Sequence, residues 1–224
     1  MNKAIYLTIM EARLLLYKKR VTGLVMFSEL TEKIDSDLEA KKAVEQLIED
    51  GYLKPSGDLE GFSFSEDIEE IIDILSRSFY TFRIKARQNK EPVRCMYLAE
   101  DKSVIMEMDM HAKDMIRIEA FEQDEAIDSI MDADYLAAAS FGPDTFSGEN
   151  VDVTDFDSEF EMPEGRLLIE RYERGNAEYD RRILVTEGDS NDNIYVEDIT
   201  GIKKGLYTEN TFKDAILEDS YDIN

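Results

Sequence analysis

Apolar residues recur along this chain with two spacings, one typical of helices and one typical of strands. Near the N-terminus, Ile9 to Tyr17 has an apolar helical face. Thr8 precedes it and Glu11 follows Thr8 by three residues, which is the arrangement of a capping box. Further capped helices are predicted at 29–34 after Ser28, at 36–50 with Gly51 as the C-cap, at 65–76, from 124 to about 136, and at 209–217 after Thr208.

Between these helices the apolar spacing changes to two, which predicts β-strands. Phe82 and Ile84, for example, lie on one side of a strand over Phe79 to Arg87. The predicted strands form a small hairpin at 52–54 and 59–64, a first meander at 79–87, 93–98, 103–108 and 115–121, and a second meander at 166–172, 181–186 and 194–199.

Each half of the chain therefore ends in a β-meander and a closing amphipathic helix. This order predicts an α+β fold of two pseudo-symmetric halves, each an antiparallel β-meander flanked by helices. The N-terminal order of three helices and a small hairpin is that of a winged helix. We divide the chain into a winged-helix-like helical module (1–76), a first meander with its helix (77–140), an acidic loop or linker (141–165) and a second meander with its helix (166–224), within one compact two-lobed unit.

Charge limits the partners that such a chain can bind. The formal net charge is −25, and the stretch from Ile118 to Gly165 holds fifteen Asp and Glu but no Lys or Arg. Such a surface repels nucleic acid and anionic lipid. The candidate recognition helix, Ser36 to Asp50, has five acids against Lys41 and Lys42, so we expect this module to bind protein and no nucleic acid. No window approaches the roughly 18 apolar residues that span a bilayer, so no membrane insertion is expected.

Catalytic residue types are scarce. His111, the only histidine, lies in an expected turn, and Cys95, the only cysteine, lies in an apolar strand. A zinc site needs several Cys or His ligands, and a nucleophilic triad needs a His base beside its nucleophile, so one His and one Cys give little support for either. Asp189 to Asn193 is similar to the start of a calcium loop, but Ile194 and Thr200 stand where Gly and Glu are required. We expect no enzyme activity, no cofactor and no metal.

The expected location is the cytoplasm. A single cysteine cannot form an internal disulfide, which is typical of a reducing compartment. Met1 to Tyr17 lacks the basic start and clean apolar run of a signal peptide, because Glu11 and Arg13 interrupt it.

Aromatic residues in the acidic segment are the candidate partner-binding residues. Solvating linkers rarely carry four Phe, so these rings either dock on the protein's own surface or bind a partner. Exposed faces of the two closing helices join them as candidates, with core packing as the alternative for their apolar residues. The candidates are Phe141, Phe146, Phe156, Phe160, Ile127, Met131, Tyr135 and Phe212.

The order of residues resembles one known family over most of residues 5 to 218. The resemblance is to the EspG-type secretion-associated proteins of type VII (ESX) secretion systems. It is one of pattern, and the chain departs from the family in its very acidic segment between the halves. It is carried by Leu7-Thr8, Glu11 and Leu15, by Ala40, Ala43, Leu47 and Gly51-Tyr52-Leu53, by Gly57-Asp58-Leu59, Ile68–Leu75, Arg94–Leu98, Val104–Met106 and Ile116–Ile118, and by Ile194–Asp198 and Gly205–Thr208.

The resemblance implies a cytosolic, non-catalytic chaperone or adaptor that binds helical secretion substrates and keeps them soluble for export. A composition rich in Lys, Glu, Asp and Ile favours a Firmicute-type relative, whose partners would be WXG100 or LXG-like secreted effectors. The protein itself would be a monomer or a homodimer. Two alternatives stay open: an acidic immunity protein that neutralises a basic toxin, and a winged-helix transcription regulator.

Overall fold

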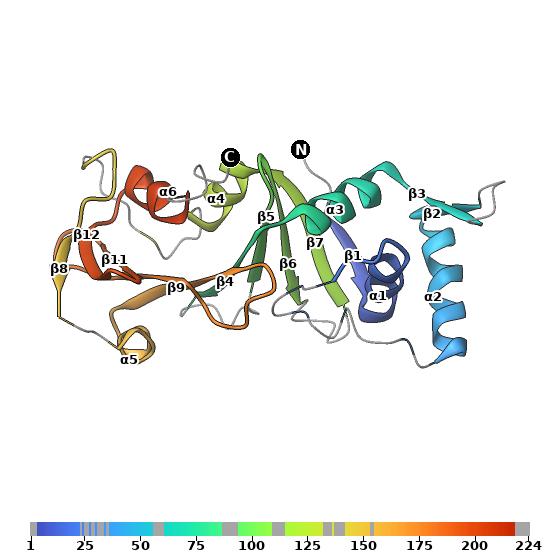
Figure 1. The fold of residues 1–224 in the computed structure, drawn as a ribbon, viewed down its shortest axis with the longest axis horizontal. Helices are drawn as coiled ribbons and strands as arrows, with labels where there is room; N and C mark the ends of the chain where they lie inside the picture. The colour runs from blue at the N-terminus through green and yellow to red at the C-terminus, as the bar shows by residue number, and fades with distance from the viewer. Residues whose placement is uncertain are drawn as a thin grey trace. The chain divides into compact units, whose positions relative to one another are not determined.

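The chain has an α+β fold with antiparallel strands. The computed structural model describes residues 4–22, 24, 27, 30, 34, 36–55, 61–86, 94–108, 115–131, 136, 142–152 and 155–217 (Figure 1). The chain divides into two compact units. Unit 1 comprises Met1–Thr81, Arg94–Gln123 and Glu173–Ala177, and unit 2 comprises Phe82–Val93, Asp124–Tyr172 and Glu178–Asn224. Strand β4 (Tyr80–Ala86) contains one of the boundaries.

Unit 1 begins with a short strand, β1 (Ile5–Thr8), that the sequence analysis missed, and continues into α1 (Ile9–Lys18). The capping box is confirmed: the Thr8 amide donates to a Glu11 carboxylate oxygen (2.7 Å), and the Glu11 amide donates to Thr8 Oγ1 (3.2 Å). The helix ends in a Schellman motif, in which the Val21 amide donates to the Leu16 carbonyl and the Arg20 amide to the Tyr17 carbonyl.

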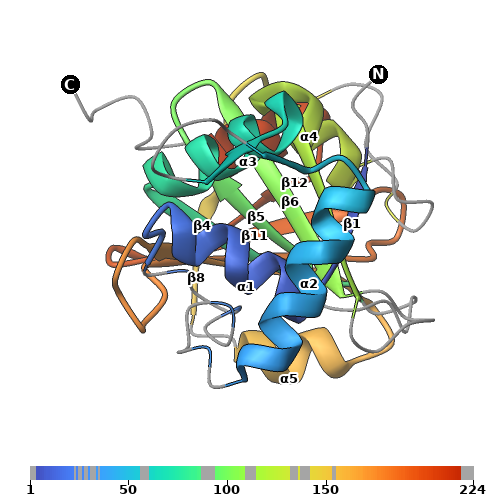
Figure 2. The ribbon, with the colours of Figure 1, turned by 90° about the vertical axis from the view of Figure 1, so that its right-hand side faces the viewer.

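Helix α2 (Asp37–Glu49) packs against α1, and the two lie side by side in Figures 1 and 2. The Ser36 side chain accepts from the Glu39 amide, as an N-cap should, and Gly51 (φ +79°) closes the helix in a second Schellman motif. The predicted hairpin follows as β2 (Leu53–Pro55) and β3 (Phe62–Phe64), and then α3 (Glu66–Arg77). The expected helix at 29–34 and the turn after Pro55 lie outside the described residues.

The sheet of unit 1 has the strand order β1-β7-β6-β5 and is antiparallel throughout. Its predicted strands are confirmed as β5 (Arg94–Leu98), β6 (Lys102–Met108) and β7 (Met115–Glu122). One core joins this sheet to the helices, and unit 1 continues past residue 76, where the expected helical module ended. Residues of that core include Leu15 from α1, Leu47 from α2, Ile68 from α3, and Val104 and Ile116 from the sheet.

The sheet of unit 2 has the order β9-β10-β11-β12-β8. Strands β9 (Gly165–Glu173), β10 (Arg181–Thr186) and β11 (Asn193–Asp198) form the predicted second meander. Strand β12 (Gly201–Leu206) lies outside the predicted strands. The unit also contains α4 (Gln123–Met131) and α6 (Glu209–Leu217), and Thr208 caps α6 by accepting from the Thr211 amide.

The acidic segment 141–165 is not the linker that its composition predicts. It contains β8 (Glu149–Val151), which pairs with β12, and α5 (Phe156–Glu161). Two further bonds tie it to unit 2, because the Phe146 amide donates to Asp214 (2.7 Å) and Asn210 donates to Asp144 (3.1 Å). Strand pairing and these hydrogen bonds give the segment a structure that its composition did not predict.

Candidate protein-binding groove

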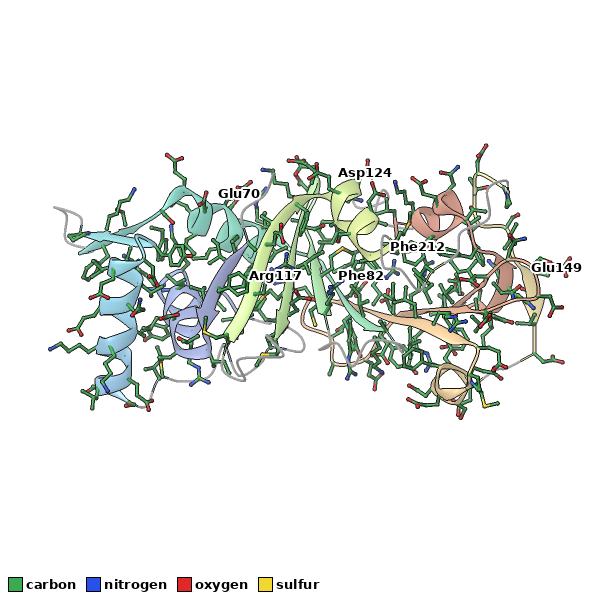
Figure 3. The ribbon with its side chains drawn as sticks, turned by 180° about the vertical axis from the view of Figure 1, so that it is seen from behind. Glu70, Phe82, Arg117, Asp124, Glu149 and Phe212 are labelled. Atoms are coloured by element: carbon green, nitrogen blue, oxygen red, sulfur yellow. The ribbon has the colours of Figure 1, made fainter. Side chains whose placement is uncertain are left out.

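Three of the predicted partner-binding residues belong to the interior of the protein. Ile127, Phe156 and Phe212 have no exposed surface. Phe156 packs with Leu168 and Leu184 on one side of the unit 2 sheet, and Phe212 packs edge to face on Tyr207 at 5.6 Å (Phe212 is labelled in Figure 3). A side chain without exposed surface cannot contact a partner in this conformation. Ile127 and Phe212 therefore pack in the core, and Phe156 docks on the protein itself.

Of the remaining candidates, three lie against other parts of the protein and two lie outside the described residues. The Phe146 ring lies on strand β12, where a Cβ at Gly205 would come within 2.9 Å of it. Phe160 is half-buried against the Phe156 cluster, and Met131 is half-buried at the end of α4. These rings dock on the protein's own surface. Phe141 and Tyr135 lie outside the described residues.

A surface groove of about 780 Å³ lies in unit 1, and the sequence analysis did not foresee it. One wall is a single face of α2. The residues of this wall fall within about 100° of the helix circumference, given 100° per residue. They are Glu39, Lys42, Ala43, Gln46 and Asp50.

The opposite wall is the junction of β1 and α1, joined by the first residue of β7. Its apolar members are Tyr6, Ile9, Met10 and Met115. Tyr6 is 48% exposed and the other three are half-buried. β1 ends the strand order, with β7 as its only strand neighbour in the described sheet. A partly exposed aromatic beside two flexible thioethers is typical of a surface that binds apolar side chains of a partner.

The alternation in β1 was the sequence signal for this wall. Ile5 and Leu7 are buried, whereas Tyr6 is exposed and Thr8 is half-buried, the pattern of a strand with one face on a core. The strand has four residues, and the last of them, Thr8, is also the helix cap, so it is short for a strand. The other groove residues come from distant parts of the chain, so no local pattern could have joined them.

The rim of the groove carries charges that the fold leaves unused. Within the described part of the chain, neither Glu39 nor Lys42 forms an ion pair. Among the described residues, the Asp50 carboxylate accepts only from the Gln46 side-chain amide, one helical turn earlier (3.1 Å). Exposed charges beside an apolar floor are the composition of a binding-site rim.

A row of charges crosses the sheet next to Tyr6. Glu107 stands opposite both Arg94 and Arg117 in the strand register, and Arg117 stands opposite Tyr6 (Arg117 is labelled in Figure 3). Glu107 accepts from Arg94 Nε at 2.6 Å and from Arg117 Nη1 at 2.8 Å. Burial alone would lower the pKa of Arg117, but Glu107 and Glu119 outweigh it and the pKa is raised. This row holds β5, β6 and β7 in register beside the groove.

The basic cluster at the end of α1 is largely engaged with the hairpin. Lys18 Nζ donates to the Phe62 carbonyl and lies 5.2 Å from the centre of the Phe64 ring. Lys19 Nζ lies 5.4 Å from the same ring and 3.3 Å from Glu69. Among the described residues, Arg20 is the one of the three cations without such a contact. The contacts use these cations within unit 1.

The outer face of α3 is acidic. Lys19 and four carboxylates, with Ile72 and Ser76, line a shallow surface hollow of about 490 Å³. Three ion pairs offset part of the charge: Lys19 with Glu69, Lys102 with Glu70 (labelled in Figure 3), and Arg77 with Asp73. The carboxylates are Glu66, Glu69, Glu70 and Asp73. A cationic partner would meet an attractive surface here.

Reactive chemistry is sparse in the described structure. Cys95 is fully buried in β5, as its apolar strand predicted, and His111 lies outside the described residues. Across the described ranges, no three His, Cys, Asp or Glu side chains are grouped to hold a metal ion. Each helix in that part of the chain is too short or too polar to span a bilayer. Neither a protein-family model nor a curated protein matches this chain.

Proposed function

We propose that this protein is a non-catalytic chaperone or adaptor that binds a helical segment of a secreted protein. The observation that carries the proposal is the groove of unit 1, with Tyr6, Ile9, Met10 and Met115 on one wall and a helix face on the other. An amphipathic helix that lays its apolar side into such a groove buries residues that would otherwise aggregate. The acidic surface keeps the loaded complex soluble.

The secretion route of the proposal comes from the resemblance of the residue order to EspG-type proteins. In this view the partners are helical WXG100 or LXG-like effectors, bound in the cytoplasm and kept competent for type VII export. The groove supports the binding part of the proposal, and the identity of the partner is left to the experiment.

The test is affinity capture with a matched pair of variants. Tyr6→Asp places a charge in the groove, and Tyr17→Asp makes the same change at a 71% exposed position of α1 that does not line it. The tagged proteins would be compared for what each retains from the cytosol of the native host. We expect wild type and Tyr17→Asp to retain a helical secretion substrate, and Tyr6→Asp to retain roughly 30-fold less, the loss of a hot-spot contact.

Two results would refute the proposal. One is equal retention of the substrate by Tyr6→Asp and Tyr17→Asp. The other is recovery of no helical secreted protein at all. Circular dichroism and a thermal melt of both variants establish whether each is folded, which is expected because both tyrosines lie at the surface.

The immunity-protein alternative has its own supporting observation, the acidic face of α3. A basic toxin domain would be steered to such a surface, and binding would weaken with salt. Reversal of Glu66 and Asp73 to Lys should then abolish protection against the captured toxin, while Tyr6→Asp should leave protection intact.

A further inference from the structure

The charges on the α2 wall specify the helix that the groove would accept, an inference that rests on the proposed function. We infer that the partner is an amphipathic helix with a cation, an anion and a second cation along one edge of its apolar stripe. The inference uses the order acidic, basic, acidic of Glu39, Lys42 and Asp50 on the groove wall.

The spacing of these three residues follows from helix geometry. At 1.5 Å per residue, Lys42 lies about 4.5 Å along the axis from Glu39, and Asp50 lies about 12 Å further. A partner helix beside α2 must therefore place its outer cations about 11 residues apart, or three turns. If the partner helix runs parallel to α2, its anion, which faces Lys42, lies three residues after its first cation. If the partner helix runs antiparallel to α2, its anion lies eight residues after its first cation.

The apolar part of the partner is set by the same groove. Ala43 is buried between the charged positions of α2, and its small side chain allows a neighbouring helix to approach closely. Tyr6, Met10 and Met115 face that approach from the other wall. Large apolar residues on the partner, spaced three or four apart, would fill the space between the walls.

Charge argues against a second copy of this chain as the occupant. In an antiparallel pairing of two α2 helices, Glu39 of one copy would face Asp50 of the other at both ends. Each copy also carries a net charge of −25, which opposes self-association. The wall therefore fits a different chain, one that is locally cationic at two positions.

Designed peptides test the inference with the full-length protein. The probes are 18-residue amphipathic helices with a constant apolar stripe and three charged positions, i, i+3 and i+11. One has the order Lys-Glu-Lys and its isomer has Lys-Lys-Glu, so composition and net charge are equal. A second pair has the same two charge orders, Lys-Glu-Lys and Lys-Lys-Glu, at positions i, i+8 and i+11, which is the spacing for an antiparallel partner. A version of the best binder with a central proline cannot form the helix.

Affinity, read by fluorescence anisotropy near physiological salt, is expected to favour one Lys-Glu-Lys peptide over its isomer by about tenfold. In the isomer, the second Lys faces Lys42 and the Glu faces Asp50 or, in the antiparallel case, Glu39, so two exposed ion pairs are replaced by two repulsions, which corresponds to about this factor. The spacing of the preferred peptide reports its direction. Lys42→Glu should erase the preference, and Lys41→Glu, a neighbouring change outside the groove lining, should preserve it.

Equal affinity of the isomers, or full binding of the proline version, would overturn the inference. These failures differ from failure of the proposed function. If the isomers bind equally while Tyr6→Asp still loses the captured substrate, only the charge order is wrong. If Tyr6→Asp retains the substrate and no peptide binds, both the groove assignment and this inference are wrong.

Discussion

At the scale of single residues, Arg20 occupies a backbone conformation that suits glycine. It is the C′ residue of the α1 Schellman motif and has φ +56°, the one non-glycine residue with positive φ in the described part of the chain. A side chain in the left-handed region costs about 1–2 kcal/mol, whereas glycine adopts it freely. Gly51 holds the equivalent place after α2 (φ +79°). Two helices of one unit thus end in the same motif with different residues.

Arg20→Gly is expected to raise the free energy of unfolding by about 0.5–1 kcal/mol, after the larger chain entropy of glycine is subtracted. Urea unfolding followed by circular dichroism measures it. Arg20→Ala removes the same charge but keeps the side-chain strain, so it should give no gain. Equal stabilisation by Ala and Gly would show that charge, and not backbone conformation, limits stability at this position.

At the scale of elements, local sequence signals identified most long elements and missed the short ones. Capping and apolar spacing located α1, α2 and α6, and alternation located the two meanders. Apolar spacing alone located α3, because its expected cap, Ser65, makes no side-chain capping hydrogen bond. Strands β1 and β8 have four and three residues, too few for an alternating pattern to predict a strand by itself, and α5 has only six. In β12 only Ile202 is buried, so pairing with β11 and β8, and not its own pattern, makes it a strand. The groove is formed by the β1–α1 junction, α2 and the start of β7. These segments are distant in the sequence, so no local pattern could predict that they lie together.

Substitutions of the aromatic residues of α5 test whether the acidic segment packs on the core of unit 2. Phe156 has no exposed surface and also lies 5.0 Å from the Arg182 guanidinium. Phe156→Ala should therefore lower the free energy of unfolding by about 3–5 kcal/mol. Phe160→Ala, at a half-buried position in the same helix, should cost clearly less. Chemical denaturation compares the two. A small effect at Phe156 would mean that α5 is not part of the unit 2 core.

The cap of α5 predicts a pH dependence. The Asp155 carboxylate accepts from Ser158 Oγ (2.7 Å) and from the Asp157 and Ser158 amides, with the Ser158 hydroxyl as the main cause that lowers the pKa of Asp155 below its ordinary 3.8. Because the folded pKa is depressed, this contribution to stability is present above pH 3.8 and is lost as the pH falls through the folded value.

Asp155→Asn keeps a capping side chain but removes the titration. We expect its stability to match wild type near neutral pH and to fall less steeply below pH 3.8. Thermal melts at a series of pH values measure both curves. Glu178→Gln, on an exposed turn, is the control for the loss of one carboxylate and should follow wild type. Parallel acid slopes for Asp155→Asn and wild type would argue against the cap.

At the scale of the whole molecule, the two units are interleaved along the chain. Residues Glu173–Ala177 belong to unit 1, although unit 2 segments precede and follow them. Within this turn, Arg174 donates to the carbonyls of Leu75, Ser76 and Ser78 at the end of α3, and to the carbonyl of Thr22. The carbonyls of Leu75 and Ser76 lie in the last turn of α3, where backbone acceptors lack intrahelical donors, so the guanidinium acts there as a C-cap supplied from a distant part of the sequence. No single cut in the chain separates one complete unit from the other.

Net charge is the other property of the whole molecule, and it opposes folding. With 51 acidic against 26 basic residues, compaction brings like charges together. Ion pairs offset this locally, but several of them, such as Lys41 with Glu45, are exposed on both sides and contribute little. We therefore expect salt to stabilise the protein, because screening weakens the long-range repulsion more than it weakens the pairs.

Raising NaCl from 20 mM to 500 mM should increase Tm by a few degrees, since about 1 kcal/mol shifts Tm by roughly 2–4 °C at this chain length. Differential scanning calorimetry measures the shift, and choline chloride at equal ionic strength should reproduce it if screening is the cause. A fall in Tm with salt would mean that the ion-pair rows, such as Arg94 with Glu107 and Arg117, outweigh the repulsion. The excess negative charge would then be tolerated without a cost in stability, and its retention would need no partner to explain it.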